Sequence, residues 1–185
     1  MKRAAATADD EVQQELCHVM VVGGSVAEWG ALTETQWHDR VATLGEMAAA
    51  AGAVWLTLRP FERGEDADRA RPVNHEVIRL PGCTVIVDPT ADGRERLVVT
   101  LRKLAEIDQL SEAAVAAALL APATTEPDLV LALGPSDRLP ASLVWELAYS
   151  ELVYLPVAWA DLRAEHLREA IGAYHRRHRR FGGLD

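Results

Sequence analysis

Short runs of apolar residues alternate along the chain with longer segments in which apolar positions repeat every three or four residues. A continuous apolar run predicts a strand covered on both faces of a sheet, whereas the longer period predicts an amphipathic helix. Four runs predict buried strands, at 18–22, 54–58, 84–87 and 129–133. The charged, proline-containing segment 59–82 predicts a loop, in which 75–80 is an alternative short strand.

The segments with the helical period predict helices at 33–51, 93–107, 111–120, 141–149 and 164–179. Thr33 can cap the first of these helices, with Gln36 at the capping-box position, and Gly52 can end it. Short apolar strands that alternate with amphipathic helices are typical of a parallel sheet with helices on its faces. We therefore expect a single α/β domain with a mostly parallel central sheet.

Composition narrows the classes of protein that fit this pattern. The length of 185 residues favours one domain, over 16–185, after a frayed or disordered start at 1–15. The formal net charge of −9 argues against a broad nucleic-acid footprint, so we expect no nucleic-acid partner. The one dense basic cluster lies at 175–180. It is either a solvated helix end, where basic side chains oppose the helix dipole, or a small local site for phosphate groups.

The cysteines and the apolar stretches bear on the cellular compartment. Cys17 and Cys83 lie far apart beside apolar runs, which favours buried free thiols in a reducing cytosol over a disulfide framework. Residues 1–15 lack the pattern of a signal peptide, and no apolar stretch is long enough to span a bilayer. We therefore expect a cytoplasmic protein.

Motifs for familiar chemistry are scarce. The turn Gly23-Gly24-Ser25 follows the first predicted strand, but it lacks the spaced glycines of a dinucleotide site and the lysine of a P-loop. His175 and His178 share a helix face without a nearby carboxylate, so the spacing does not indicate zinc. Judged from such motifs alone, the chain is an α/β domain of unassigned chemistry.

The last third of the chain holds the most specific sequence: EPDLV at 126–130, Arg138-Leu139, LVWELAYSELVY at 143–154, WADL at 159–162 and RRFGG at 179–183. These segments resemble the cis-prenyltransferases, the family that includes undecaprenyl diphosphate synthase. A patchier resemblance extends upstream through 82–106 and 54–58 to His18 and Trp29. It implies the family's fold for nearly the whole chain.

The departures from the family pattern lie where the resemblance places the diphosphate sites. In the family an aspartate after the first strand binds magnesium, and an arginine before the tryptophan binds diphosphate. Gly24 and Glu28 occupy these positions here. In the second site Ala132 replaces an arginine and Pro140 replaces a serine, and only Arg138 remains. Because a diphosphate leaving group needs neutralisation by cations and metal, these changes predict that the chain has no working site of its own.

The middle of the chain is also short. The resemblance places the long helices that line the family's prenyl tunnel between Pro72 and Gly82, where this sequence has only a few residues. A tunnel for a long lipid needs wall area, and this segment is too short to supply it.

What the chain retains suggests a partner. In the family the tail of one subunit binds diphosphate in the neighbouring active site, and Arg180 and Gly182 match that motif. The retained tail and lost site resemble the Nogo-B-receptor-type partner of dehydrodolichyl diphosphate synthase. We therefore expect a non-catalytic subunit of a heterodimer or heterotetramer, which binds isopentenyl diphosphate in trans through Arg180, Gly182 and Arg138. Mg²⁺ would be bound mainly by the catalytic partner.

Four apolar side chains in the matched region are candidate interface residues, because large aromatics often anchor interfaces: Trp145, Tyr149, Leu152 and Tyr154. Glu151 aligns with a magnesium ligand of the family, and its alternative role is a hydrogen bond at the subunit face. Arg138 can hold a residual anion or pair with Asp137.

Two other functions compete with the accessory subunit. One is a divergent homodimeric prenyltransferase that makes a short product, and the lost residues at Gly24, Glu28 and Ala132 count against it. The other is a binding module that reuses the fold, and the retained tail counts against it.

Overall fold

The computed structural model describes residues 16–148 and 150–181, and of 177–181 it describes only the helical backbone. Within these residues the chain forms one six-stranded sheet with strand order β3-β4-β2-β1-β5-β6. The strands are β1 (His18–Val22), β2 (Trp55–Arg59), β3 (Glu76–Leu80), β4 (Cys83–Val87), β5 (Leu129–Leu133) and β6 (Glu151–Leu155). Only the pairing of β3 with β4 is antiparallel, which confirms the mostly parallel sheet.

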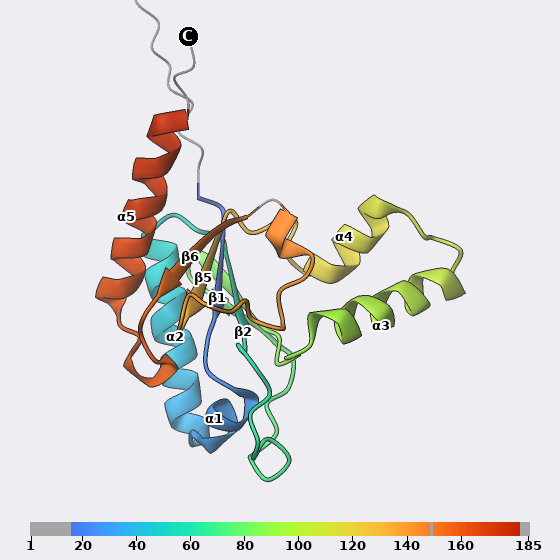
Figure 1. Cartoon of the computed structure of the whole chain (residues 1–185), viewed down its shortest axis with the longest axis horizontal. Helices are drawn as coiled ribbons and strands as arrows, with labels where there is room; N and C mark the ends of the chain where they lie inside the picture. Colours follow the sequence, from blue (N-terminus) through green and yellow to red (C-terminus); the bar gives the residue numbers. More distant parts are fainter. Residues whose placement is uncertain (1–15, 149, 182–185) are drawn as a thin grey trace, which may run out of the picture.

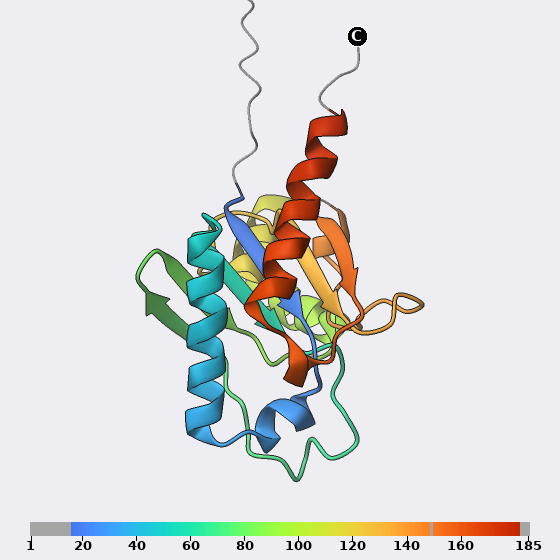
Figure 2. The same ribbon diagram turned by 90° about the vertical axis from the view of Figure 1, so that its left-hand side faces the viewer.

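Helices lie on both sides of the sheet. They are α1 (Val26–Ala31), α2 (Glu34–Ala50), α3 (Gly93–Glu106), α4 (Glu112–Leu120) and α5 (Ala164–Phe181), with short 3₁₀ turns η1 (Glu146–Ala148) and η2 (Trp159–Asp161). Helices α2 and α5 lie side by side on one face, and α3 and α4 form a hairpin that projects from the other side (Figures 1 and 2). The single α/β domain is therefore confirmed.

Local sequence signals explain where most helices begin and end. Thr33 and Gln36 form the expected capping box of α2, and Gly52 follows its end at a φ of +91°. Ser111 caps α4 through its hydroxyl, and Asp92 caps α3 through its carboxylate. These side chains satisfy backbone N–H groups that have no partner within the helix.

The main core lies between the sheet and the helices α2 and α5. The central strands β1 and β5 are buried along their whole length, as their unbroken apolar runs predict. One face of α5 packs on this core through Leu167, Ile171 and Tyr174. The alternative strand at 75–80 is present as β3, at one edge of the sheet.

The predicted helix at 141–149 is wrong. Over 141–148 the chain is irregular except for the single turn η1, because its polar groups bind other elements instead of extending a helix. The Ser142 hydroxyl donates to the Pro60 carbonyl at 2.7 Å, and the Glu146 carboxylate is buried against arginines from β2 and α3. Strand β6 and helix α1 were not predicted, since β6 directly continues an apolar run and α1 is too short to show a period.

Candidate functional site

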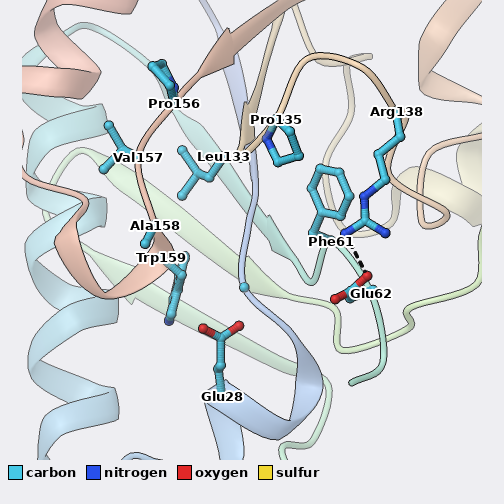
Figure 3. A pocket seen from close by; sticks show the side chains of 12 residues that line it. Glu28, Phe61, Glu62, Leu133, Pro135, Arg138, Pro156, Val157, Ala158 and Trp159 are labelled. Atoms are coloured by element: carbon cyan, nitrogen blue, oxygen red, sulfur yellow. Dashed lines mark ion pairs between the residues drawn. The ribbon is translucent and has the colours of Figure 1, made fainter. Parts of the chain in front are cut away.

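A cavity of about 430 Å³ lies at the carboxyl ends of β1, β5 and β6 (Figure 3). In open α/β sheets this edge is the usual position of a ligand site. Its walls are mostly apolar, and six residues supply them: Phe61, Leu133, Pro135, Pro156, Val157 and Trp159. Glu28, Glu62 and Arg138 are the charged residues at its border. The cavity coincides with the two positions where the sequence predicts damaged diphosphate sites.

In the turn after β1, the backbone N–H groups of residues 25–28 already have partners. Ser25 and Glu28 satisfy each other, since the Ser25 N–H donates to the Glu28 carboxylate at 2.7 Å and the Glu28 N–H donates to the Ser25 hydroxyl at 3.1 Å. The two N–H groups between them donate to the carbonyls of Glu62 and Arg63 at 3.1 and 3.2 Å. A helix N-terminus binds phosphate through free N–H groups. Here a carboxylate of the chain itself occupies that position.

Gly24 lies where the resemblance places a magnesium-binding aspartate. Its φ is +68°, a conformation that most side chains avoid. A Cβ atom at this position would lie 2.9 Å from both Cβ and Cγ of Trp159. The tryptophan is held by its contact with Trp29, at 5.3 Å between ring centroids, and by Arg40, whose guanidinium lies 5.2 Å from the Trp159 ring centroid and donates to its carbonyl. The position therefore has no room for a side chain.

The end of β5 and the loop after it are where the resemblance places the second diphosphate site. Ala132 is fully buried in β5 and brings no charge to the cavity. Arg138 does line the cavity, but it pairs with Glu62 at 2.9 Å and not with Asp137. Its guanidinium lies 4.9 Å from the centroid of the Phe61 ring. The retained arginine therefore has a partner within the chain.

The sequence analysis missed a buried group of four charges, which we call the ion quartet: Arg59, Asp88, Arg96 and Glu146. Arg59 donates to Asp88 at 3.0 Å and also to Glu146, whose side chain is fully buried. Arg96 donates to Glu146 at 2.6 Å and lies 3.6 Å from Asp88. One sequence signal could have indicated this group, namely the charged residue Glu146 inside the apolar run 143–147. Two positive and two negative charges balance, which is what burial of ions requires.

The candidate interface residues have contacts within the chain. The Trp145 indole donates to Glu126 at 2.9 Å, and its ring packs on the cluster between α3 and α4. Leu152 packs beside a small cluster under β1 and β5, and the Tyr154 hydroxyl donates to the Arg138 carbonyl at 3.2 Å. Tyr149 lies outside the described residues.

Glu151 begins β6 and is half-buried. Among residues 16–148 and 150–181, no three His, Cys, Asp or Glu side chains come together in a way that suits a metal ion. The described residues therefore leave the predicted role of Glu151 as a metal ligand untested.

Helix α5 carries the tail motif away from the cavity. The helix begins just after η2, beside the cavity, and runs back past the amino ends of the strands (Figure 2). At 1.5 Å per residue, Arg180 lies about 24 Å along the axis from Ala164. Gly182 lies outside the described residues.

His18 is the buried titratable group of β1. Its Nδ1 donates to the Thr125 carbonyl at 2.8 Å, and its Nε2 accepts from the Thr57 hydroxyl at 2.9 Å. Burial lowers the pKa of His18 from 6.5. Burial also raises the pKa of the Cys83 thiol to about 11, so this thiol stays protonated at neutral pH.

None of the described helices is long and apolar enough to cross a membrane.

Comparison with known proteins shows to which family the chain belongs. The sequence model of the family described as "Putative undecaprenyl diphosphate synthase" matches residues 82–182, more than half of the chain. The chain belongs to this prenyltransferase family. The match contains Arg138, Glu151 and Arg180, whereas the turn at Gly24 lies outside it.

Relatives of the prenyltransferase family match parts of the chain. The ditrans,polycis-undecaprenyl-diphosphate synthase of Micrococcus luteus is 31% identical over 111 residues, which are 56% of this chain and 45% of that enzyme. The isoprenyl transferase of Brucella abortus is 30% identical over 136 residues, which are 67% of this chain and 54% of that protein. The chain thus spans about half the length of these curated relatives.

Solved structures of the same family share the fold. A probable undecaprenyl diphosphate synthase from Campylobacter jejuni aligns with a TM-score of 0.60 at 18% identity, over 91% of this chain and 99% of that one. Lavandulyl diphosphate synthase from Lavandula x intermedia, in complex with dimethylallyl diphosphate, aligns with a TM-score of 0.58 at 19% identity, over 85% and 94%. At these identities the likeness concerns the fold alone.

Proposed function

We propose that this chain is the non-catalytic subunit of a heteromeric cis-prenyltransferase. It stabilises a catalytic partner and supplies Arg180 and Gly182 to the isopentenyl diphosphate site of that partner. The observation that carries this proposal is the Glu28 carboxylate at the start of α1, in the position where a diphosphate would need free N–H donors.

The electrostatics of the cavity support the loss of catalysis. Departure of a diphosphate builds negative charge, which has to be stabilised by cations, metal ions or N–H donors. Glu28 adds negative charge, and Glu62 neutralises Arg138. Trp159 fills the space beside Gly24 where a metal-binding side chain would stand.

The structure of the middle segment agrees with the missing tunnel. Where the resemblance places tunnel helices, the chain between Pro72 and Gly82 forms only strand β3, which pairs directly with β4. A substrate chain would therefore find no helical wall in this segment.

The direction of α5 supports action in trans. Because the helix begins beside the cavity and carries Arg180 about 24 Å along its axis from Ala164, a diphosphate bound by this residue would belong to another subunit. The basic cluster at 175–180 lies in the last turns of the same helix.

Exposed apolar side chains support the presence of a partner. Four lie on α3 or in the turn that follows it, and they are 41–61% exposed: Val98, Val99, Ile107 and Leu110. Figure 1 shows that this hairpin projects away from the sheet. Exposed apolar side chains that gather on one element often mark an interaction surface.

Co-expression with a complete cis-prenyltransferase from the same genome tests the proposal. We expect the two chains to co-purify, and we expect magnesium-dependent condensation of isopentenyl diphosphate with an allylic diphosphate only when the catalytic chain is present. Turnover by this chain alone, free of host enzyme, would instead support a divergent homodimeric enzyme that makes a short product.

A further inference from the structure

We infer that the cavity at the carboxyl ends of β1, β5 and β6 binds a basic peptide segment of a partner protein, namely a cationic side chain next to an apolar one. This site is separate from the action of Arg180. Its test needs neither the catalytic partner nor turnover, so either proposal can fail without the other.

The charges at the border of the cavity select against anions. Glu28 and Glu62 contribute two negative charges, and Arg138 is the only positive one among the described residues that line it. Because Arg138 already pairs with Glu62, Glu28 is left as a carboxylate that faces the cavity without a cationic partner in the described chain. An incoming cation would gain this interaction, whereas an anion would meet repulsion.

A buried donor at the same cavity requires an acceptor. Trp159 is 3% exposed, and its indole N–H has no hydrogen-bond partner among the described residues. In Figure 3 the Trp159 side chain points down and Glu28 points up toward the same part of the cavity. A buried donor left unpaired costs free energy, so a ligand that offers a carbonyl there recovers it.

The remaining walls need apolar contact. Leu133, Pro156 and Val157 face the space opposite the carboxylates, and its volume of about 430 Å³ lies in the range of ligand sites. An anionic lipid would cover the apolar walls, and a diphosphate would accept from the Trp159 indole N–H. The Glu28 carboxylate would repel the negative charge of either one. A basic peptide satisfies all three features, because its side chain meets Glu28, its backbone carbonyl meets Trp159, and an adjacent apolar residue covers the walls.

Two substitutions distinguish binding of a basic peptide in the cavity from residual binding of an anion. Glu28→Gln removes the charge but keeps an acceptor for the Ser25 N–H, since glutamine also serves in a capping box. It should weaken binding of a cationic peptide about two- to fivefold, as expected for an exposed ion pair. Arg138→Gln frees Glu62 and should tighten the same binding, whereas it would weaken any diphosphate binding. Glu34→Gln, at the exposed start of α2, is the matched control and should change nothing.

The readout is the ¹H–¹⁵N signal of the Trp159 indole, identified through Trp159→Phe, during titration of the full-length chain with acetyl-Leu-Arg-Leu-amide. We expect saturable movement that weakens with added salt, and much less movement with the glutamine and glutamate versions of the peptide. The inference is wrong if inorganic diphosphate moves this signal at lower concentration than the peptide does. It is also wrong if the three peptides act alike, or if none of them moves the signal.

Discussion

At the scale of single residues, groups of the chain itself fill the turn after β1. Glu28 accepts from the Ser25 N–H, and Trp159 occupies the space beside Gly24. The loss of catalysis that we propose is therefore a matter of space as well as of missing side chains. Restoring a single residue of the family pattern should not restore the site.

Gly24→Asp tests this view. We expect it to destabilise the fold by about 1–3 kcal/mol, because the new Cβ meets Trp159 and overpacking has costs of this order. We also expect no gain in prenyltransferase activity. Gly52→Asp is the control, since Gly52 has a similarly positive φ but no atom within 4 Å of an added Cβ. Equal losses in urea unfolding for the two variants would show that Trp159 does not close the site.

His18 makes the stability of the fold dependent on pH. Because burial lowers its folded-state pKa below 6.5, the unfolded chain binds more protons once the pH falls to that value. The contribution of His18 is therefore fully present above about pH 6.5 and is lost as the pH falls from there toward the folded-state pKa. His18→Gln should flatten the slope of unfolding free energy over this window, while His38→Gln, at an exposed position, should leave it unchanged. An unaltered slope in His18→Gln would contradict this assignment.

At the scale of elements, the ion quartet fixes an irregular segment to the sheet. It joins β2, α3 and η1, and so holds 141–148 beside the base of the α3–α4 hairpin. Charges with so little exposure are stabilising only as a complete set, because a buried ion without its partner is costly.

Glu146→Ala should lower the unfolding free energy by about 3–5 kcal/mol, since it leaves two buried guanidinium groups short of a carboxylate. Asp68→Ala removes the partner of Arg63 in a pair that is 65% and 84% exposed, and we expect a change within about 0.5 kcal/mol. The midpoints of urea unfolding compare the two. A loss for Glu146→Ala no larger than that for Asp68→Ala would show that the quartet does not stabilise the fold.

The α3–α4 hairpin offers a test of the partner surface. Val98→Asp should reduce recovery of the catalytic partner in co-purification at least tenfold, because it replaces an exposed apolar side chain of the proposed partner surface with a charge. The monomer should stay folded, as the side chain is already 43% exposed. Val54→Asp changes a residue that is 50% exposed outside the hairpin and should leave recovery intact. Equal recovery of both variants would place the interface elsewhere.

Sequence reasoning succeeded where local pattern and tertiary packing agree. The unbroken apolar runs of β1 and β5 predict buried strands, and the Thr33–Gln36 capping box predicts the start of α2. It failed at 141–155, where Glu146 and Ser142 bind groups far away in sequence and an edge strand pairs with β5. Long-range pairing of this kind leaves no period in the sequence, so the partners of Glu146 in the ion quartet and the contacts that fill the turn after β1 could be recognised only in three dimensions.

At the scale of the whole molecule, the cavity and Arg180 lie toward opposite ends of the sheet. The cavity occupies the carboxyl ends of the strands, and α5 carries Arg180 past their amino ends. The proposed role of Arg180 therefore requires a second chain whose diphosphate site comes within reach of this residue.

The most direct measurement is the condensation rate of the assembled complex when this subunit carries Arg180→Ala and its catalytic partner is unaltered. An arginine contact to diphosphate is worth about 1.5–3 kcal/mol, so we expect the rate to fall roughly tenfold to a hundredfold. Gel filtration should show an intact complex, and Arg180→Lys should recover part of the rate, because lysine keeps the charge but lacks the planar fork. A normal rate with Arg180→Ala in an intact complex would contradict the account and leave the basic cluster as a solvated helix end.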